Sequence, residues 1–117
     1  MHAQFAGFGH VTIDGVRYDE DVVVANGTIR QREKAESRKL KATYGHTPLS
    51  EREPIPWSCK TLIIGTGAHG RLPITDAVHA AAREHDVHLV AAPTEEACRL
   101  LSAADVSTTN AILHLTC

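Results

Sequence analysis

Aromatic residues are scarce in this sequence. They make up 4% of its 117 residues, with a single tryptophan, two tyrosines and two phenylalanines. A chain of this length forms one domain, residues 1–117, and buries roughly two thirds of the surface that its unfolded state exposes. The core must therefore be aliphatic. Long apolar runs are also absent: none approaches the ~20 residues that span a membrane, so we predict no membrane contact.

Cysteines are also few, with three in the chain. Cys59, Cys98 and Cys117 form an odd set without a short repeated spacing, which is typical neither of a disulfide framework nor of a zinc site. The first residues lack the charged segment and long apolar stretch of a signal peptide. We therefore expect a reduced, cytoplasmic protein whose thiols act as small buried apolar groups.

A strong charge of either sign is missing as well. The net charge is −2, so the chain has no general attraction for nucleic acid. Residues 30–41 nevertheless hold six of the twelve basic residues: Arg30, Arg32, Lys34, Arg38, Lys39 and Lys41. Because no aromatic residue is interleaved for base stacking, we interpret this segment as a solvated strand end and loop, and predict no nucleic-acid partner.

The first half of the chain predicts two β-hairpins. Asp14-Gly15 separates two alternating apolar runs, and Asn26-Gly27 does so again within residues 22–32. These dipeptides favour the two-residue turns in which both central residues have positive φ. The result is a layer of short antiparallel strands, whose exposed edges make a homo-oligomer by edge pairing an open possibility.

Residues 42–59 read as a loop because three prolines interrupt them. Ser50 and Glu53 have the spacing of a capping box, which allows one short helical turn. Trp57 either seals an edge of the core or flanks a pocket.

The second half follows a strand–helix–strand–helix–strand pattern. Residues 61–64 form a continuous apolar run, as expected of a central strand covered on both faces. Pro73 is predicted to open the first helix, and Thr94 to cap the second. A buried strand at 87–91 and a last strand at 111–115 complete the pattern. Short crossovers favour a parallel last strand, but a mixed sheet leaves its direction open.

The run Gly65-Thr66-Gly67-Ala68-His69-Gly70 matches the G-x-G-x-x-G pattern of dinucleotide sites. In such sites the helix packs closely against the strand at the third glycine, whereas here Arg71, Leu72 and Pro73 delay the helix. We therefore favour a glycine turn and predict no cofactor.

A weaker ligand hypothesis survives at the same place. This loop and Pro93-Thr94 each follow a strand, and open α/β sheets bind ligands at the carboxyl ends of their strands. Backbone amides from both loops would hold a small anion or metabolite. The candidate ligand-binding residues are Gly65, Thr66, Gly67, His69, Arg71 and Thr94.

The sequence offers little support for a metal site or for a nucleophilic catalytic residue. None of the eight histidines pairs at i, i+4 within a helix or lies in a Cys-x-x-Cys context, so we predict no metal site. His88 and His114 lie inside apolar strands, as hydrogen-bonded core or edge histidines commonly do. Nothing marks Cys98 or Cys117 as an activated thiol. We predict no catalytic residues.

Several short motifs, taken in order, resemble the Mth938-domain family. They are Leu62-Ile63-Ile64-Gly65-Thr66-Gly67, then Pro73, then Pro93-Thr94-Glu95-Glu96-Ala97-Cys98, and finally His114-Leu115-Thr116-Cys117. The most similar branch is that of small cytosolic proteins linked to adipogenesis, which also end in His-x-Thr-Cys. Mitochondrial assembly factors of respiratory complex I form a more distant branch. The resemblance extends from about Val11 onward.

The resemblance implies a three-layer α/β fold: a central mixed sheet flanked by helices, with an N-terminal antiparallel hairpin layer. It implies no catalytic residue, because none is established for the family. Arg30, Gln31 and Arg32 stand where family members often carry tryptophans, and Leu101-Ser102 replaces a common aromatic-asparagine pair. A partner surface built from those aromatics therefore does not carry over.

Together these features favour a small, non-catalytic interaction or assembly module with an unknown protein partner. The alternative is an anion- or metabolite-binding protein, either a binding protein alone or an enzyme, that uses a cleft between residues 65–70 and Pro93-Thr94. A deep polar pocket at those loops favours the second hypothesis, and a filled edge favours the first.

Overall fold

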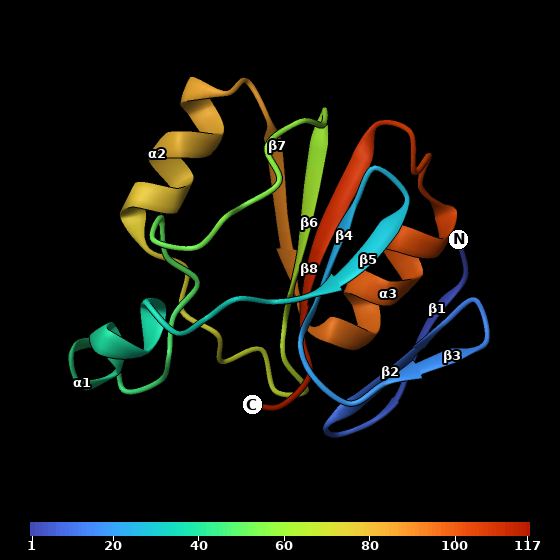
Figure 1. Ribbon diagram of the computed structural model, residues 1–117, viewed down its shortest axis with the longest axis horizontal. Coiled ribbons are helices and arrows are strands. Elements are labelled where there is room, and N and C mark those ends of the chain that lie inside the picture. The colour runs from blue at the N-terminus through green and yellow to red at the C-terminus, as the bar shows by residue number, and fades with distance from the viewer.

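The computed structural model describes residues 1–117 and contains two β-sheets (Figure 1). The smaller sheet consists of β1 (Ala3–Gly7), β2 (His10–Ile13) and β3 (Val16–Tyr18), in that order. The larger sheet has the order β5 (Thr28–Gln31), β4 (Val22–Ala25), β8 (Thr109–His114), β6 (Thr61–Thr66) and β7 (His88–Ala92). The helices are α1 (Lys41–Tyr44), which follows a 3-10 turn at Ser37–Leu40, α2 (Asp76–Glu84) and α3 (Thr94–Ala103).

Both predicted hairpins are confirmed. Asp14 and Asn26 have φ of 50° and 53°, as the first residue of a tight hairpin turn requires. The hairpins nevertheless enter different sheets: β2 and β3 stay in the small sheet, whereas β4 pairs antiparallel with β8 in the large one. The sequence pattern gave no indication of β1, which lies beside β2.

The large sheet is mixed, as the resemblance implies. β8 runs parallel to β6 and antiparallel to β4, which settles the direction of the last strand. The strand at the middle of the sheet is β8, with β6 beside it. The prediction of a buried strand at 87–91 was wrong, because β7 lies at the sheet edge and is partly exposed.

Two helix starts differ from the prediction. α2 begins at Asp76 with Thr75 as its N-cap, because Pro73 and Thr75 are held in extended backbone by hydrogen bonds to Leu49. In α3 the N-cap is Pro93, and Thr94 is already helical. The Thr94 hydroxyl is therefore not a cap and bonds to other elements.

Two apolar clusters lie on the two faces of the large sheet. One joins the sheet to α3 and the small sheet through residues such as Val11, Leu101 and Leu113. The other covers the opposite face through residues such as Leu62 and Val78. Trp57 packs at the edge of this second cluster and stacks on His85, with ring centroids 5.2 Å apart. The fold is thus the predicted three-layer α/β arrangement. None of its helices has both the length and the hydrophobicity needed to cross a membrane.

Candidate functional site

The two predicted ligand loops do meet in the structure. The Gly67 amide donates to the Thr94 hydroxyl oxygen at 2.8 Å, and the Thr94 amide donates to the Gly67 carbonyl at 3.0 Å. The Thr94 hydroxyl in turn donates to the carbonyl of His114. Thr94 therefore ties together β6, α3 and β8. Gly65 is buried beneath it, and Thr66 ends β6.

The last residues of the chain occupy the space beside these loops. The amide of Ala68 donates to the Thr116 carbonyl at 2.6 Å, and that of Arg71 donates to the Cys117 carbonyl at 3.0 Å. The amides of Gly67, Ala68 and Arg71 are thus already used within the protein. His69 and Arg71 are exposed, and the His69 ring lies 6.4 Å from that of Phe8. Binding of an anion or metabolite between the two loops stays a prediction.

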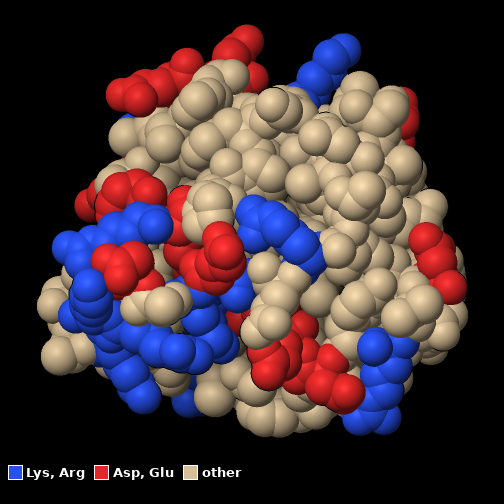
Figure 2. All heavy atoms as spheres, in the orientation of Figure 1, with Lys and Arg blue, Asp and Glu red and all other residues tan.

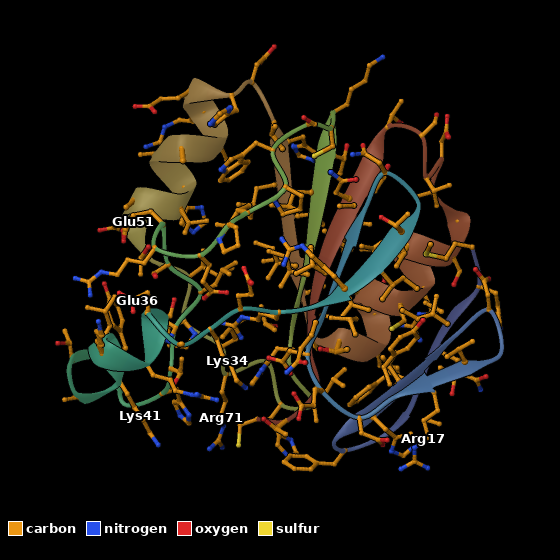
Figure 3. The ribbon with its side chains drawn as sticks, viewed as in Figure 1. Arg17, Lys34, Glu36, Lys41, Glu51 and Arg71 are labelled. Atoms are coloured by element: carbon orange, nitrogen blue, oxygen red, sulfur yellow. The ribbon has the colours of Figure 1, made fainter.

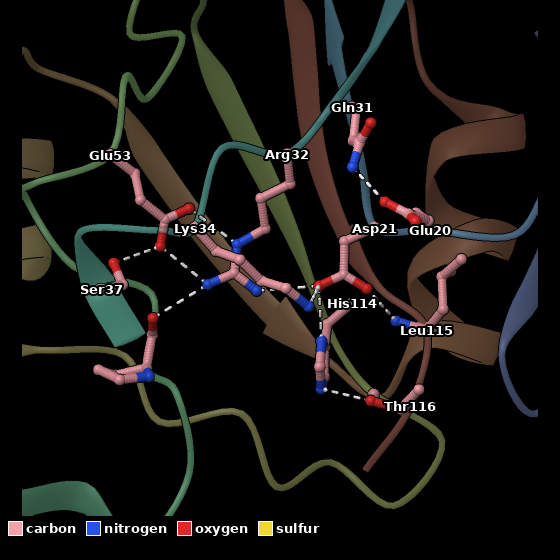
Figure 4. A network of polar contacts seen from close by, with 12 residues as sticks. Glu20, Asp21, Gln31, Arg32, Lys34, Ser37, Glu53, His114, Leu115 and Thr116 are labelled. Carbon is pink, nitrogen blue, oxygen red and sulfur yellow. Dashed lines mark hydrogen bonds and ion pairs between the residues drawn. The ribbon is translucent and has the colours of Figure 1, made fainter. Parts of the chain in front are cut away.

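A buried ion network lies on the other side of these last residues (Figure 4). Arg32 follows β5, and its side chain is 1% exposed. It makes a bidentate pair with Glu53 at 2.7 and 2.8 Å and donates to Asp21 at 2.9 Å. Ser37 donates to Glu53 at 2.6 Å. The interpretation of residues 30–41 as solvated was therefore wrong for Arg32, because two buried carboxylates surround its guanidinium.

Asp21 links this network to the C-terminal residues. One carboxylate oxygen accepts from Arg32 and lies 2.7 Å from His114 Nδ1, while the other accepts the Leu115 amide at 2.9 Å. Lys34 Nζ lies 3.8 Å away. Burial by itself raises the pKa of Asp21, but the hydrogen bond and charge of His114, the charge of Lys34 and the Leu115 amide together lower it to about 2.

His114 has a defined orientation between Asp21 and Thr116. Its Nδ1 faces the Asp21 carboxylate, and its Nε2 lies 3.3 Å from the Thr116 hydroxyl oxygen. The carboxylate, imidazole and hydroxyl thus follow one another in the same order as in the Asp-His-Ser catalytic triad of hydrolases. Here, however, the carboxylate also binds Arg32 and the Leu115 amide. The arrangement therefore anchors the last residues of the chain.

Almost no feature of the sequence indicates this network. Asp21 and His114 are 93 residues apart, and no spacing motif connects segments so distant. Charged residues are also rarely buried, so the basic segment around Arg32 suggested a surface. The one usable signal was His114, a polar residue inside an apolar strand. It is hydrogen-bonded, as predicted for a histidine in that position.

An open depression of about 900 Å³ lies next to the network, between the end of β5 and the turn before α1. Only two of the fifteen residues that line it are hydrophobic, and most of the others are charged. Figure 2 shows charged side chains of both signs gathered on the α1 side of the molecule, and in Figure 3 Lys34 lies between α1 and the sheet. The charged lining residues are Asp19, Glu20, Asp21, Glu33, Glu36, Arg30, Arg32, Lys34, Arg38 and Arg52.

The thiols lie apart from this depression. Burial raises the pKa of Cys98 to about 11, and it also raises the pKa of Cys59. Both groups are therefore protonated at neutral pH and are poor nucleophiles. This agrees with the prediction that Cys98 is not activated.

Comparison with known proteins identifies a family and several similar solved structures. Residues 4–103 match the family model described as "Protein of unknown function (DUF498/DUF598)". The conserved hypothetical protein PH1505 from Pyrococcus horikoshii OT3 is 27% identical, with a TM-score of 0.79 and full coverage of both chains. A solved structure named MT938 is 25% identical, with a TM-score of 0.73, and the alignment covers 99% of this chain and 98% of that one.

A more distant likeness concerns the fold alone. An outer membrane protein from Bartonella henselae is 15% identical, with a TM-score of 0.61 over 98% of this chain and 96% of its own. No curated protein matches the sequence.

Proposed function

The chain belongs to the DUF498/DUF598 family of proteins of unknown function and has the Mth938-like fold, and we propose that it is a non-catalytic interaction module that docks a partner protein on the β5 edge. The observation that carries this proposal is the unpaired outer edge of β5. This strand ends the large sheet, and β4 is its only neighbour within it (Figure 1).

The register shows which backbone groups of β5 face outward. Ala25 pairs with Thr28 next to the two-residue turn, and the residues of such a pair bond to each other. Hydrogen-bonded and non-hydrogen-bonded pairs alternate along antiparallel strands, so the backbone groups of Arg30 also bond to β4. The Arg32 amide continues this pattern by donating to the Asp21 carbonyl at 2.8 Å. The amides and carbonyls of Ile29 and Gln31 therefore point away from β4.

An outward row of amides and carbonyls is what an extended partner segment needs to add a strand. The edge has no proline or bulge that would block such pairing, since the β4–β5 register is continuous. Its outer residues Arg30 and Gln31 are exposed. A docking role for the edge accounts for the exposure of these groups without invoking a reaction.

The test is a variant that removes one outward donor. Gln31→Pro deletes the Gln31 amide proton, which is not part of the β4 ladder, and edge strands tolerate proline at such positions. Gln31→Ala is the matched control, because it loses the same side chain but keeps the amide. Each tagged protein is used to capture partners from a cytoplasmic extract, the compartment that the sequence predicts, and the partners are quantified by mass spectrometry.

We expect the wild type and Gln31→Ala to retain a common set of partners that Gln31→Pro loses. Circular dichroism and urea unfolding check that Gln31→Pro still folds. Retention of every partner by a folded Gln31→Pro variant would reject the β5 edge as the docking surface.

A further inference from the structure

We infer that the partner segment docked on β5 is acidic, with Asp or Glu at alternate positions. This inference rests on the proposed function and adds the chemistry of the partner. It starts from the position of the depression of about 900 Å³, which is lined by Arg30, Gln31 and Arg32 and so begins directly at the β5 edge.

The acidic side chains that line the depression are mostly engaged within the protein. Asp19 pairs with Arg17, Asp21 with Arg32 and Glu36 with Lys39. Glu20 accepts a hydrogen bond from the neutral Gln31 side chain and makes no ion pair. Glu33 is the one acidic lining residue whose side chain makes neither an ion pair nor a hydrogen bond.

The basic side chains are in the opposite situation. Arg38 and Arg52 are exposed and make no ion pair, and Arg30 bonds only to the carbonyls of Gln31 and Pro54. Lys34 lies 3.8 Å from Asp21, a carboxylate that Arg32 already binds. The lining holds five acidic and five basic side chains, but among those without an ion pair the basic Arg30, Arg38 and Arg52 outnumber the acidic Glu20 and Glu33. Carboxylates would complement these arginines.

Strand geometry fixes the spacing of those carboxylates. Ile29 packs against the core cluster that contains α3, so it lies on the α3 face of the sheet. Arg30 and Arg32 point to the opposite face, where the depression lies, because side chains alternate along a strand. A segment paired with β5 would place every second side chain over the depression. The favoured partner is thus an extended segment with an acidic residue at every second position.

A single-stranded nucleic acid would also bring negative charge, but the depression does not suit it. No aromatic side chain lines it, so it offers no platform for stacking bases. Its open shape and its many charged lining residues likewise differ from the enclosed sites of small metabolites, which are lined mostly by hydrophobic side chains. A protein segment fits both the charge of the depression and the free edge.

The test measures peptide binding by fluorescence anisotropy. The probe is a labelled peptide of alternating Glu and Thr, about eight residues long, the length of an ordinary strand. A peptide with Gln in place of Glu measures the contribution of charge. We expect the Glu peptide to bind about tenfold more tightly than the Gln peptide, because an exposed ion pair contributes a factor of about two to five. Added salt should reduce this difference.

Two sets of variants test the site. The double variant Arg38→Ala/Arg52→Ala should remove most of the advantage of the Glu peptide. The matched control Lys60→Ala/Arg83→Ala removes the same charge outside the depression and should leave the advantage unchanged. Gln31→Pro should abolish the binding of both peptides, and Gln31→Ala should not.

The possible outcomes separate this inference from the proposed function. If the Glu and Gln peptides bind equally and both fail to bind Gln31→Pro, the inference that the partner is acidic is wrong. The proposal that β5 is the docking edge would still hold. Failure of the Glu peptide to bind, or tighter binding of a single-stranded RNA at the same site, would also overturn the inference. Light scattering provides a further check: a wild-type dimer that Gln31→Pro converts to a monomer would identify a second copy of this chain as the occupant.

Discussion

At the scale of single residues, Asp21 organises the polar interior. Its carboxylate binds Arg32, the imidazole of His114 and the amide of Leu115. A buried carboxylate with so many partners favours its ionised form. Glu53 plays the corresponding role on the other side of Arg32, and no buried polar side-chain atom of the structure lacks a hydrogen-bond partner. Removing one member of this network should therefore be costly.

The first prediction concerns Arg32. Replacing it by Met leaves Asp21 and Glu53 buried without their cation, and loss of one partner from a buried pair costs about 3–5 kcal/mol. We expect urea unfolding of Arg32→Met to show a loss of that size. Arg17→Ala is the control, because its pair with Asp19 is 63% and 65% exposed and contributes at most about 1 kcal/mol. Equal losses in the two variants would contradict the central position of Arg32.

The second prediction concerns acid stability. Folding lowers the pKa of Asp21 from an ordinary value of 3.8 to about 2, so the folded state favours the carboxylate. The associated stabilisation is fully present above about pH 5 and is lost as the pH falls from about 4 to about 2, because the unfolded chain binds the proton first. Its size is about 2 kcal/mol.

Asp21→Asn isolates this contribution from that of other carboxylates. The stability difference between wild type and variant, measured by urea unfolding at each pH, should shrink across that window. A difference that stays constant from pH 5 to pH 2 would show that Asp21 does not have a lowered pKa in the folded protein.

At the scale of elements, the glycine turn after β6 receives the chain that leaves β8. Gly67 has φ of +105°, and a Cβ at this position would lie 2.4 Å from the carbonyl carbon of Cys117. Gly70 also has positive φ, +66°, but its nearest neighbours would be 3.6 Å away. The turn therefore needs glycine at position 67 for close backbone packing as well as for conformation.

The third prediction compares these two glycines. Gly67→Ala should cost about 3 kcal/mol or more, because backbone strain and a clash with the last residues add together. Gly70→Ala should cost only about 1 kcal/mol, from strain alone. The Cys117 thiol should react faster with a thiol reagent in Gly67→Ala than in Gly70→Ala. Similar stabilities and similar thiol reactivities would argue against tight packing at this turn.

Local rules identified most elements but not all of their neighbours. Asp14-Gly15 and Asn26-Gly27 fixed both hairpins because turn conformation depends on residues adjacent in sequence. The start of α2 was misplaced because Pro73 pairs with Leu49, which is far away in the chain. The role of Thr94 was missed for the same reason. Its hydroxyl bonds to Gly67 and His114, which belong to other elements.

At the scale of the whole molecule, β8 lies at the centre and is paired on both sides, with β4 and β6. Its residues contribute to both apolar clusters, through Leu113 on one face and Ile112 on the other. The two edge strands, β5 and β7, are at the opposite extreme, each with one partner strand and one free edge. Stability should therefore fall from the centre of the sheet toward both edges.

The fourth prediction is a gradient of hydrogen exchange. Amides of Thr109–His114 should exchange only when the whole protein unfolds, whereas the outward amides of Ile29 and Gln31 should exchange much faster. Exchange mass spectrometry or NMR measures both. Strong protection of Ile29 and Gln31 in the isolated protein would show that the β5 edge is already covered, and would contradict the proposed docking surface.

The sequence by itself determined the α/β class, the two hairpins, the order of strands and helices in the second half and the glycine turn after β6. These follow from periodicity, turn chemistry and proline, which act over a few residues. Only the tertiary structure decided that β4 pairs with β8 and that Arg32 is buried between Asp21 and Glu53. It also decided that the last residues of the chain pack against the glycine turn. Each of these depends on groups tens of residues apart, whose pairing is favourable only when the folded chain removes them from water together.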